Sequence, residues 1–301
     1  LVPLTALWKD RQLAVLQAVG YPDPNLSHFR SIEIWDTASK SSEYRQQGWL
    51  TRAFADAPTP AAFAADGVII GTNDMGPLAG GGTRAIALAD AERFIRRAQL
   101  VHVETARGNA ALRHILKTEG DIVQAAGKLG GRHEFSTAFP ATPFGNAIKT
   151  ACRVVAGPAN VAAVRVTLNG FDTHGGQAPT QAQLLLELAQ GLVALRAALS
   201  EIDRWKSTLV ITYAEFGRRA QENLSAGTDH GTASVHFALG GRVIGALYGE
   251  TPALSGLAVN ANVAHAIDFR SVYATVLDRW WNVDSRTVLG GRFAPLPFLE
   301  A

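Results

Sequence analysis

The sequence contains very little sulfur, with one cysteine and one methionine among its 301 residues. Cys152 has no second cysteine to pair with, so a disulfide within the chain is excluded. The single cysteine does not define the compartment, because many exported proteins contain no disulfide.

An excess of charge of one sign is also lacking. The chain carries 28 Lys and Arg residues against 26 Asp and Glu residues, which gives a net charge of +2. Its basic residues form no run. Proteins that bind nucleic acids usually present a concentrated basic surface, so we expect no nucleic-acid partner.

Long hydrophobic runs are absent from the sequence as well. A membrane-spanning helix needs about 18 or more consecutive apolar residues, and no run reaches that length, so we expect no transmembrane segment. The sequence starts at Leu1 without an initiator methionine or a signal peptide, so we expect a processed or truncated product. Hydrophobic residues make up 47% of the chain, enough for a sizeable core.

What is present is an alternation of strand-like and helix-like segments. Apolar stretches predict strands within residues 11–25, 67–74, 161–172 and 207–219, and helical periodicity predicts helices over 26–39, 142–157, 180–205 and 268–283. This alternation predicts an α/β fold with a doubly wound, mostly parallel sheet flanked by helices. We expect one domain over residues 1–301, with a helical cap insertion at about 90–130.

Polar groups follow the predicted strands, at the edge where open α/β sheets bind ligands. Four segments supply them: Ser27 and His28 after the first strand, Asp172 and His174 after the strand at 161–168, Glu215 and Arg218 after the strand at 208–213, and Asp229 and His230 on the next loop. We expect the two Asp/His pairs to converge.

Carboxylate oxygens and imidazole nitrogens together suit zinc, manganese or iron. Two Asp/His pairs, both near glycines, therefore favour a metal site. The alternatives from the residues alone are a capped turn at Asp172, an ion pair of Glu215 with a neighbouring arginine, and an Asx-turn at Asp229. His236 lies in an apolar stretch and is interpreted as a core histidine.

Several motifs resemble the bacterial domain-of-unknown-function 1501 family: "GYPDPNLSHFRSIEIW", "FDTHGGQ", "TYAEFGRR", "GTDHGTAS" and "DFRSVYATVL", in this order. The resemblance runs from about Leu4 to Phe298. The family resembles a distant branch of the alkaline phosphatase and sulfatase superfamily, which implies an alkaline-phosphatase-like fold. Its members usually carry a twin-arginine export signal, so the resemblance implies a periplasmic or otherwise exported protein.

The resemblance also implies a site with up to two divalent ions, zinc or manganese. Asp172 and His174 would be ligands on one side, and Asp229 and His230 on the other. Ser27 would take the place of the nucleophile. We further expect Glu215 to be a ligand or a base, and Arg218 or Arg270 to hold an oxygen of the substrate.

The leading hypothesis is a metal-dependent hydrolase of phosphate or sulfate esters, with a small anionic ester as substrate. The alternative is a non-catalytic exported protein, for binding or assembly, that keeps the fold with one metal or none. Related sequences carry an aspartate and a first strand upstream of the position of Leu1. We therefore expect this chain to bind at most one metal tightly and to self-associate through an exposed sheet edge.

Overall fold

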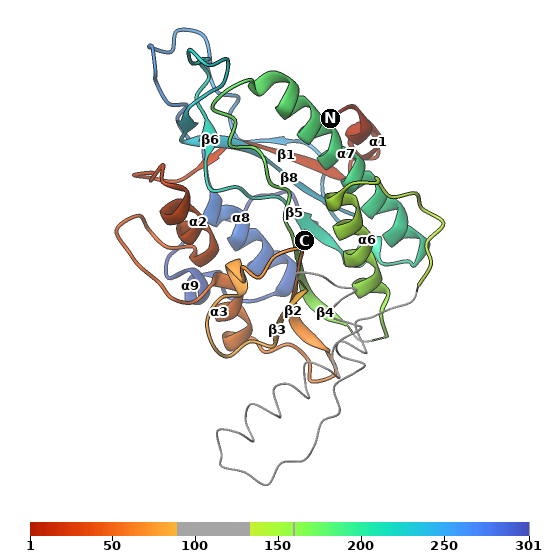
Figure 1. Cartoon of the computed structure of the whole chain (residues 1–301). Helices are drawn as coiled ribbons and strands as arrows, with labels where there is room; N and C mark the ends of the chain where they lie inside the picture. Colours follow the sequence, from red (N-terminus) through yellow and green to blue (C-terminus); the bar gives the residue numbers. More distant parts are fainter. Residues whose placement is uncertain (89–132, 159, 301) are drawn as a thin grey trace.

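The computed structural model describes residues 1–88, 133–158 and 160–300. It shows a mixed α/β protein in which helices pack on both faces of a central sheet (Figure 1). The predicted cap insertion at about 90–130 lies outside the described residues.

The central sheet is mixed and contains strands from both ends of the chain. Its strand order is β10 (Ile267–Asp268), β1 (Leu13–Gly20), β8 (Ala233–Gly240) and β5 (Leu209–Ile211), with β9 (Leu247–Tyr248) also paired to β1. β8 runs antiparallel to both β1 and β5, whereas β9 and β10 run parallel to β1. The sheet is therefore mixed, with β8 reversed relative to the other four strands, and the prediction of a mostly parallel sheet is confirmed only in part.

A second sheet is parallel throughout, with the order β3 (Ala85–Leu88), β2 (Ala65–Ile70) and β4 (Val161–Val166). A third pairs β6 (Gly217–Arg218) with β7 (His230–Gly231) in antiparallel orientation. The predicted strands at 11–25, 67–74, 161–172 and 207–219 each overlap a strand. An apolar run shows that a strand is buried but not the direction of its neighbours, which is why the reversed direction of β8 was not predicted.

β5 is shorter than the apolar run that predicts it, because a side chain interrupts its pairing. The backbone N–H of Thr212 still donates to the carbonyl of Phe237, at 2.9 Å. The N–H of Phe237, however, donates to the hydroxyl of Thr212 instead of a backbone carbonyl, at 2.8 Å. The strand ends there, and residues from Tyr213 onward leave the sheet.

The four predicted helices are confirmed as α2 (His28–Thr37), α6 (Pro143–Ala156), α7 (Gln177–Glu201) and α8 (Phe269–Thr275), the last continuing as a π-helical turn over Val276–Trp281. Pro143 begins α6, and Thr142 accepts a hydrogen bond from the Gly145 N–H at 3.0 Å, which is a standard helix start. The structure adds the short helices α1 (Thr5–Lys9), α3 (Trp49–Asp56) and α9 (Ser285–Leu289) and the 3-10 turns Val2–Leu4, Gly76–Leu78 and Trp205–Ser207.

The core lies on both faces of the central sheet because successive side chains of a strand point to opposite faces. In β1, Ala14 and Leu16 pack with α2, α3, α8 and α9, whereas Leu13 and Val15 pack with α6 and α7. A third cluster joins α6 to the parallel sheet. The sheet is thus flanked by helices on both sides, as predicted.

α7 is the one helix of the described ranges that is long and apolar enough to span a membrane, with a mean hydropathy of 1.4 over an 18-residue window. Leu192 and Leu199 of α7 are buried in a cluster with Phe144 and Ile148 of α6. Core helices often have this composition, so the finding indicates a membrane only weakly. The absence of a transmembrane segment stays a prediction.

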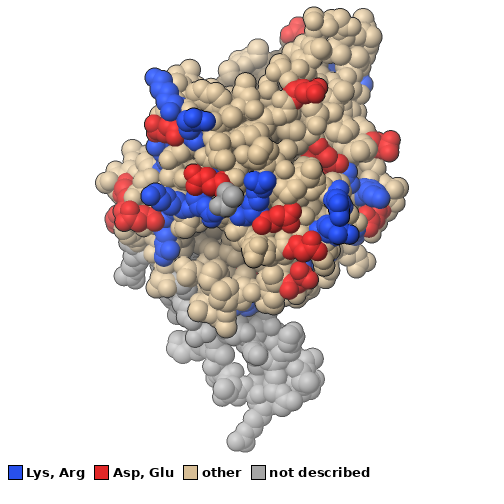
Figure 2. All heavy atoms as spheres, turned by 180° about the vertical axis from the view of Figure 1, so that it is seen from behind, with Lys and Arg blue, Asp and Glu red and all other residues tan. Residues whose placement is uncertain are grey.

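The surface charges are mixed in sign on the face turned away from the viewer of Figure 1. Figure 2 shows that face, where Lys and Arg side chains lie among Asp and Glu side chains in a band across its middle. This distribution agrees with the small net charge of the sequence.

α2 is fixed against residues 213–216 along its whole length. The Ser31 hydroxyl donates to the carbonyl oxygen of Glu215 at 2.6 Å, and the Tyr213 hydroxyl donates to Asp36 at 3.0 Å. Trp35 stacks on Phe269 of α8, with ring centroids 4.3 Å apart. These contacts set the position of the first residue of α2, His28.

Asp36 is buried, and its burial raises the pKa of the carboxyl from 3.8 to about 7, although the charge of Arg165 and the hydrogen bond from Tyr213 oppose the rise. The folded protein therefore keeps a proton that the unfolded chain loses above pH 4. The free energy of unfolding must then fall as the pH rises from about 4 to about 7.

We predict that Asp36→Asn removes this loss, because the amide cannot ionise but can still accept from Tyr213. Relative to the variant, the wild type should lose on the order of 2–3 kcal/mol of unfolding free energy between pH 5 and pH 8. Urea unfolding at both pH values, with chelator present, measures this. Burial lowers the pKa of His236 to about 4, but that contribution is common to both proteins. Exposed Asp56→Asn is the control, and equal pH dependence in wild type and Asp36→Asn would contradict the prediction.

Candidate metal centre

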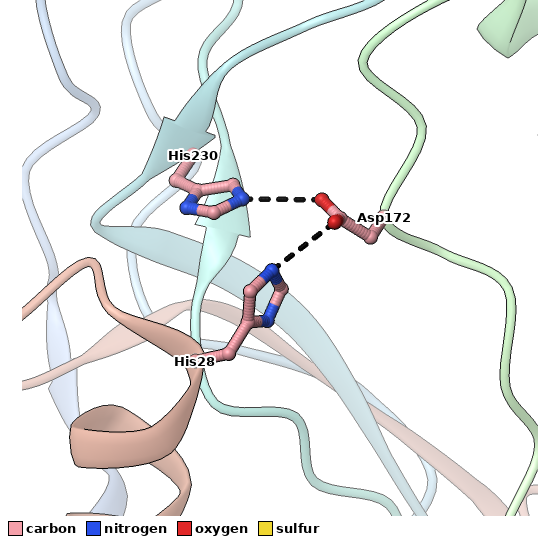
Figure 3. Close-up of side chains that lie close together, drawn as sticks. All are labelled: His28, Asp172 and His230. Carbon is pink, nitrogen blue, oxygen red and sulfur yellow. Dashed lines mark hydrogen bonds and ion pairs between the residues drawn. The ribbon is translucent and has the colours of Figure 1, made fainter.

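Three segments that are far apart in the sequence bring metal-ligating side chains together. His28 begins α2, Asp172 lies in the loop after β4, and His230 lies in β7 (Figure 3). The Nε2 atoms of His28 and His230 each lie 3.1 Å from a different oxygen of the Asp172 carboxylate. One ligand atom from each residue falls within a span of 4.8 Å, which is close enough to share one ion.

The two loops that carry these groups are held together by backbone hydrogen bonds. The N–H of Thr228 donates to the Thr173 carbonyl at 3.2 Å, and the N–H of Gly176 donates to the Ser225 carbonyl at 3.0 Å. A Cβ on Gly227 would lie 2.2 Å from the carbonyl carbon of His174, so only glycine permits this approach. The predicted convergence of the two Asp/His pairs is therefore seen, although their strands belong to different sheets.

His174 adds a third imidazole to the cluster. Its Nε2 lies 2.9 Å from the Nε2 of His230 and 2.9 Å from Asp172 Oδ1. Asp229 lies on the other side of this ring, with its Oδ1 3.7 Å from His174 Nδ1. The direct ligation predicted for Asp229 stays a prediction, since its carboxylate faces the ring nitrogen that points away from Asp172.

Hydrogen bonds to Nδ1 define the tautomers of His28 and His230. The Nδ1 of His28 lies 2.8 Å from Glu215 Oε1, and the Nδ1 of His230 lies 2.8 Å from the Leu26 carbonyl oxygen. Carboxylate and carbonyl oxygens accept hydrogen bonds, so both Nδ1 atoms must donate. In a neutral ring the only other nitrogen, Nε2, then carries a lone pair.

These lone pairs point at the oxygens of Asp172, which also only accept. Acceptors at 3.1 Å repel each other unless a cation lies between them. The cation is either a proton on each ring or one metal ion that all the groups share. A ring that donates from one nitrogen to a carboxylate or carbonyl and presents the other is the usual arrangement of a metal-ligating histidine.

The charge around Asp172 is arranged to keep it ionised. With a proton on each ring, partial burial favours a raised pKa, but the hydrogen bond from His230 and the nearby histidine and arginine charges outweigh it and lower the pKa of Asp172. Arg218 belongs to this set, with Nη2 3.1 Å from Asp172 Oδ1. The Nε and Nη1 atoms of Arg218 are buried and have no hydrogen-bond partner among the described residues.

One wall of the cluster is aromatic, and the opposite side is open. The Phe216 ring packs against His28 and His230, with centroid distances of 4.8 and 4.2 Å. The side chains of His28, Asp172 and His174 are 40–49% exposed. A dissolved molecule can therefore reach the cluster directly.

Of the other predicted site residues, Glu215 and Ser27 lie beside the cluster and Arg270 does not. Glu215 touches it through His28, and Ser27, the exposed N-cap residue of α2, directly precedes His28. Arg270 is not brought to the cluster: it is buried and pairs with Asp268, with Nη2 2.6 Å from Oδ2. Its contacts are with Asp268 and the Phe293 ring, and the expectation that it holds a substrate oxygen stays a prediction.

Sequence reasoning placed His28 at a strand end without making it a ligand, and it did not identify Phe216. The available signal for His28 was its position at the first turn of a helix beside Ser27, at the same sheet edge as the Asp/His pairs. Phe216 carried no signal of its own, because a phenylalanine after a strand is usually part of the core.

Comparison with known proteins identifies the family of the chain. A family model described as "Protein of unknown function (DUF1501)" matches residues 8–291. The chain belongs to this family. No curated protein and no solved structure matches it.

We predict that in metal-free protein the Nδ1 atoms of His28 and His230 both carry a proton, because each faces a hydrogen-bond acceptor. Replacing Glu215 with alanine removes the acceptor that selects this form in His28 and should change the tautomer of His28 but not of His230. Imidazole ¹⁵N chemical shifts measure both. The exposed His133 provides the reference ring. Nε2–H tautomers at His28 and His230 in the wild type would contradict the deduced geometry.

Proposed function

We propose that this protein is a metal-dependent hydrolase of phosphate or sulfate esters, with one divalent ion held by His28, Asp172, His174 and His230. The observation that carries the proposal is the approach of the Nε2 atoms of His28 and His230 to the Asp172 carboxylate, at 3.1 Å, while the Nδ1 atom of each ring faces another acceptor. A single cation shared by these groups would satisfy both Nε2 atoms and the carboxylate.

The donor set fits such an ion. Three imidazole nitrogens and one carboxylate oxygen are ligands typical of zinc, and the same set also suits manganese. The groups behind them support the ligands: Glu215 orients His28, the Leu26 carbonyl orients His230, and Asp229 lies beside the far nitrogen of His174. Partners of this kind fix ring orientation and increase ligand basicity.

The side chains around the cluster suit an anionic substrate. Arg218 has two buried nitrogens that lack a partner within the described chain, and a guanidinium binds phosphate or sulfate oxygens with two parallel hydrogen bonds. Ser27 lies at the start of α2, where unpaired backbone N–H groups favour negative charge. When bound, the ion would activate a water or serine oxygen and offset charge on the ester oxygens.

Ser27 is the residue that we propose as nucleophile. It is exposed, it precedes His28 in the sequence, and its hydroxyl makes no capping hydrogen bond within the described structure. Phe216 packs against the rings of His28 and His230, so we expect a substrate to approach from the exposed side. Arg218 would then hold the anionic group while Ser27 or a water attacks it.

We predict that protein purified without chelator contains about one zinc or manganese ion per chain, and that Asp172→Asn loses it. Glu215→Gln should bind the ion roughly ten- to a hundredfold more weakly, because a ligand-orienting carboxylate is lost. Elemental analysis and competition with a chromogenic chelator measure stoichiometry and affinity. Glu222→Gln, an exposed change of the same charge on the same segment, is the matched control. Metal content that is equal in wild type and Asp172→Asn would refute the metal centre.

We also predict metal-dependent hydrolysis of 4-nitrophenyl phosphate or 4-nitrophenyl sulfate. Ser27→Ala should abolish turnover while the metal content stays at the wild-type level, because its hydroxyl is not among the proposed ligands. Unchanged turnover in Ser27→Ala would instead assign the attack to a water. A wild type that holds its metal and cleaves neither ester would favour the non-catalytic alternative, binding or assembly, over the hydrolase.

A further inference from the structure

A second site candidate lies at the opposite end of α2 from the metal centre. A cavity of about 520 Å³ opens between the end of α2, the segment that follows it, the start of α8 and the turn after α9. Its charged lining residues are Lys40, Glu43, Arg45, Arg270 and Arg292. Four cations thus line one cavity together with a single carboxylate.

Arg270 is fixed in this cavity by its neighbours. Its Nε and Nη2 bind the two oxygens of Asp268, at 2.8 and 2.6 Å, and its guanidinium lies 4.6 Å from the centre of the Phe293 ring. Its third nitrogen, Nη1, has no partner among the described residues. A buried arginine with one free edge is a preorganised donor for an anion.

The segment that carries the other cations is also held in place. Arg30 of α2 donates to the carbonyl oxygens of Lys40 and Ser41 at 3.1 and 3.0 Å, and also to that of Glu43. Glu43 in turn orients Arg45, with Nε 2.6 Å from Oε1. Arg45 packs on the backbone of Gly290. A Cβ added at Gly290 would lie 2.6 Å from Arg45 Nη2, and the φ of Gly290 is +70°, so this position favours glycine.

The charges do not cancel within the site. Glu43 offsets one of the four cations and Asp268 a second, which leaves two positive charges facing the cavity. Leu289, Ala38 and Phe293 add apolar surface to the lining. Small-molecule sites combine such apolar walls with a few fixed polar groups, and they have volumes of roughly 300–1,000 Å³.

We propose that this cavity binds a small organic molecule through a phosphate or sulfate ester group, which carries up to two negative charges as a phosphate and one as a sulfate. Arg270, Arg45, Arg292 and Lys40 hold the anionic group, and Phe293 and Leu289 contact the uncharged body. The proposal goes beyond the proposed function, because none of these residues belongs to the metal centre. The ten residues of α2 separate the two sites by roughly 15 Å.

The test uses inorganic pyrophosphate, phosphate and sulfate as probes, measured by isothermal titration in the presence of chelator. The wild type should bind pyrophosphate at one site, and Arg292→Ala and Lys40→Ala should each weaken binding by roughly tenfold. Both changes leave the buried Arg270 pair intact. Arg286→Ala removes the same charge from an exposed position of α9 outside the cavity and should bind like the wild type. A comparison of phosphate with sulfate separates the two chemical sources of the anion.

Three results would overturn the proposal. The first is the absence of binding of all three probes at millimolar concentration. The second is equal affinity in Arg292→Ala and Arg286→Ala. The third is loss of binding in Arg218→Ala with retention in Arg292→Ala, which would place the anion at the metal centre. Unchanged pyrophosphate binding in Asp172→Asn would support this site whether or not that variant still holds metal, so the two proposals can fail separately.

Discussion

The position of α2 against residues 213–216 is the constraint on which the rest of the site depends. Along its length, three side chains of α2 meet this segment: His28 meets the Glu215 carboxylate, Ser31 meets the Glu215 carbonyl, and Asp36 meets the Tyr213 hydroxyl. The segment itself exists as a loop because β5 ends at Ile211, where the Thr212 hydroxyl takes over from the backbone as acceptor. If β5 continued, Glu215 would lie in the sheet and could not reach His28.

α2 therefore connects three features that differ in their chemistry. Its first residue faces Asp172, its buried carboxyl at Asp36 is held by Tyr213, and its last turn borders the cationic cavity. A shift of α2 by one residue would break the hydrogen bonds to residues 213–216 together. Burying Asp36 is costly for an ionised carboxyl, and its raised pKa reflects that cost. An apolar residue in place of Asp36 would avoid this cost but could not bind the Tyr213 hydroxyl. The hydrogen bond fixes the position of α2, and this agrees with Asp36 serving the position of the helix more than the stability of the fold.

Much of this arrangement could be predicted from the sequence, and the rest depends on long-range geometry. Helical periodicity located α2, α6, α7 and α8, and apolar stretches located β1, β2, β4 and β5. The direction of β8 could not be predicted, because burial of a strand on both faces looks the same in parallel and antiparallel sheets. The convergence of Asp172 with His230 was predicted from one parallel sheet, but it arises from the loop contacts of Thr173, Gly176 and Gly227 instead. The family of the chain followed from the order of its motifs.

Ligand identity is where local sequence reasoning reaches its limit. Adjacent residues such as Asp229 and His230 look equivalent in the sequence, but a strand or extended loop points successive side chains in opposite directions. His230 therefore turns toward Asp172 while Asp229 lies beside His174 Nδ1, 3.7 Å away. His28 enters the cluster from a segment more than 140 residues away, and only the structure shows that its Nδ1 is occupied by Glu215. The Nδ1 atoms of His28 and His230 each face an acceptor, so in a neutral ring the lone pair lies on Nε2. Both Nε2 atoms face Asp172, and this is the place where a cation is needed.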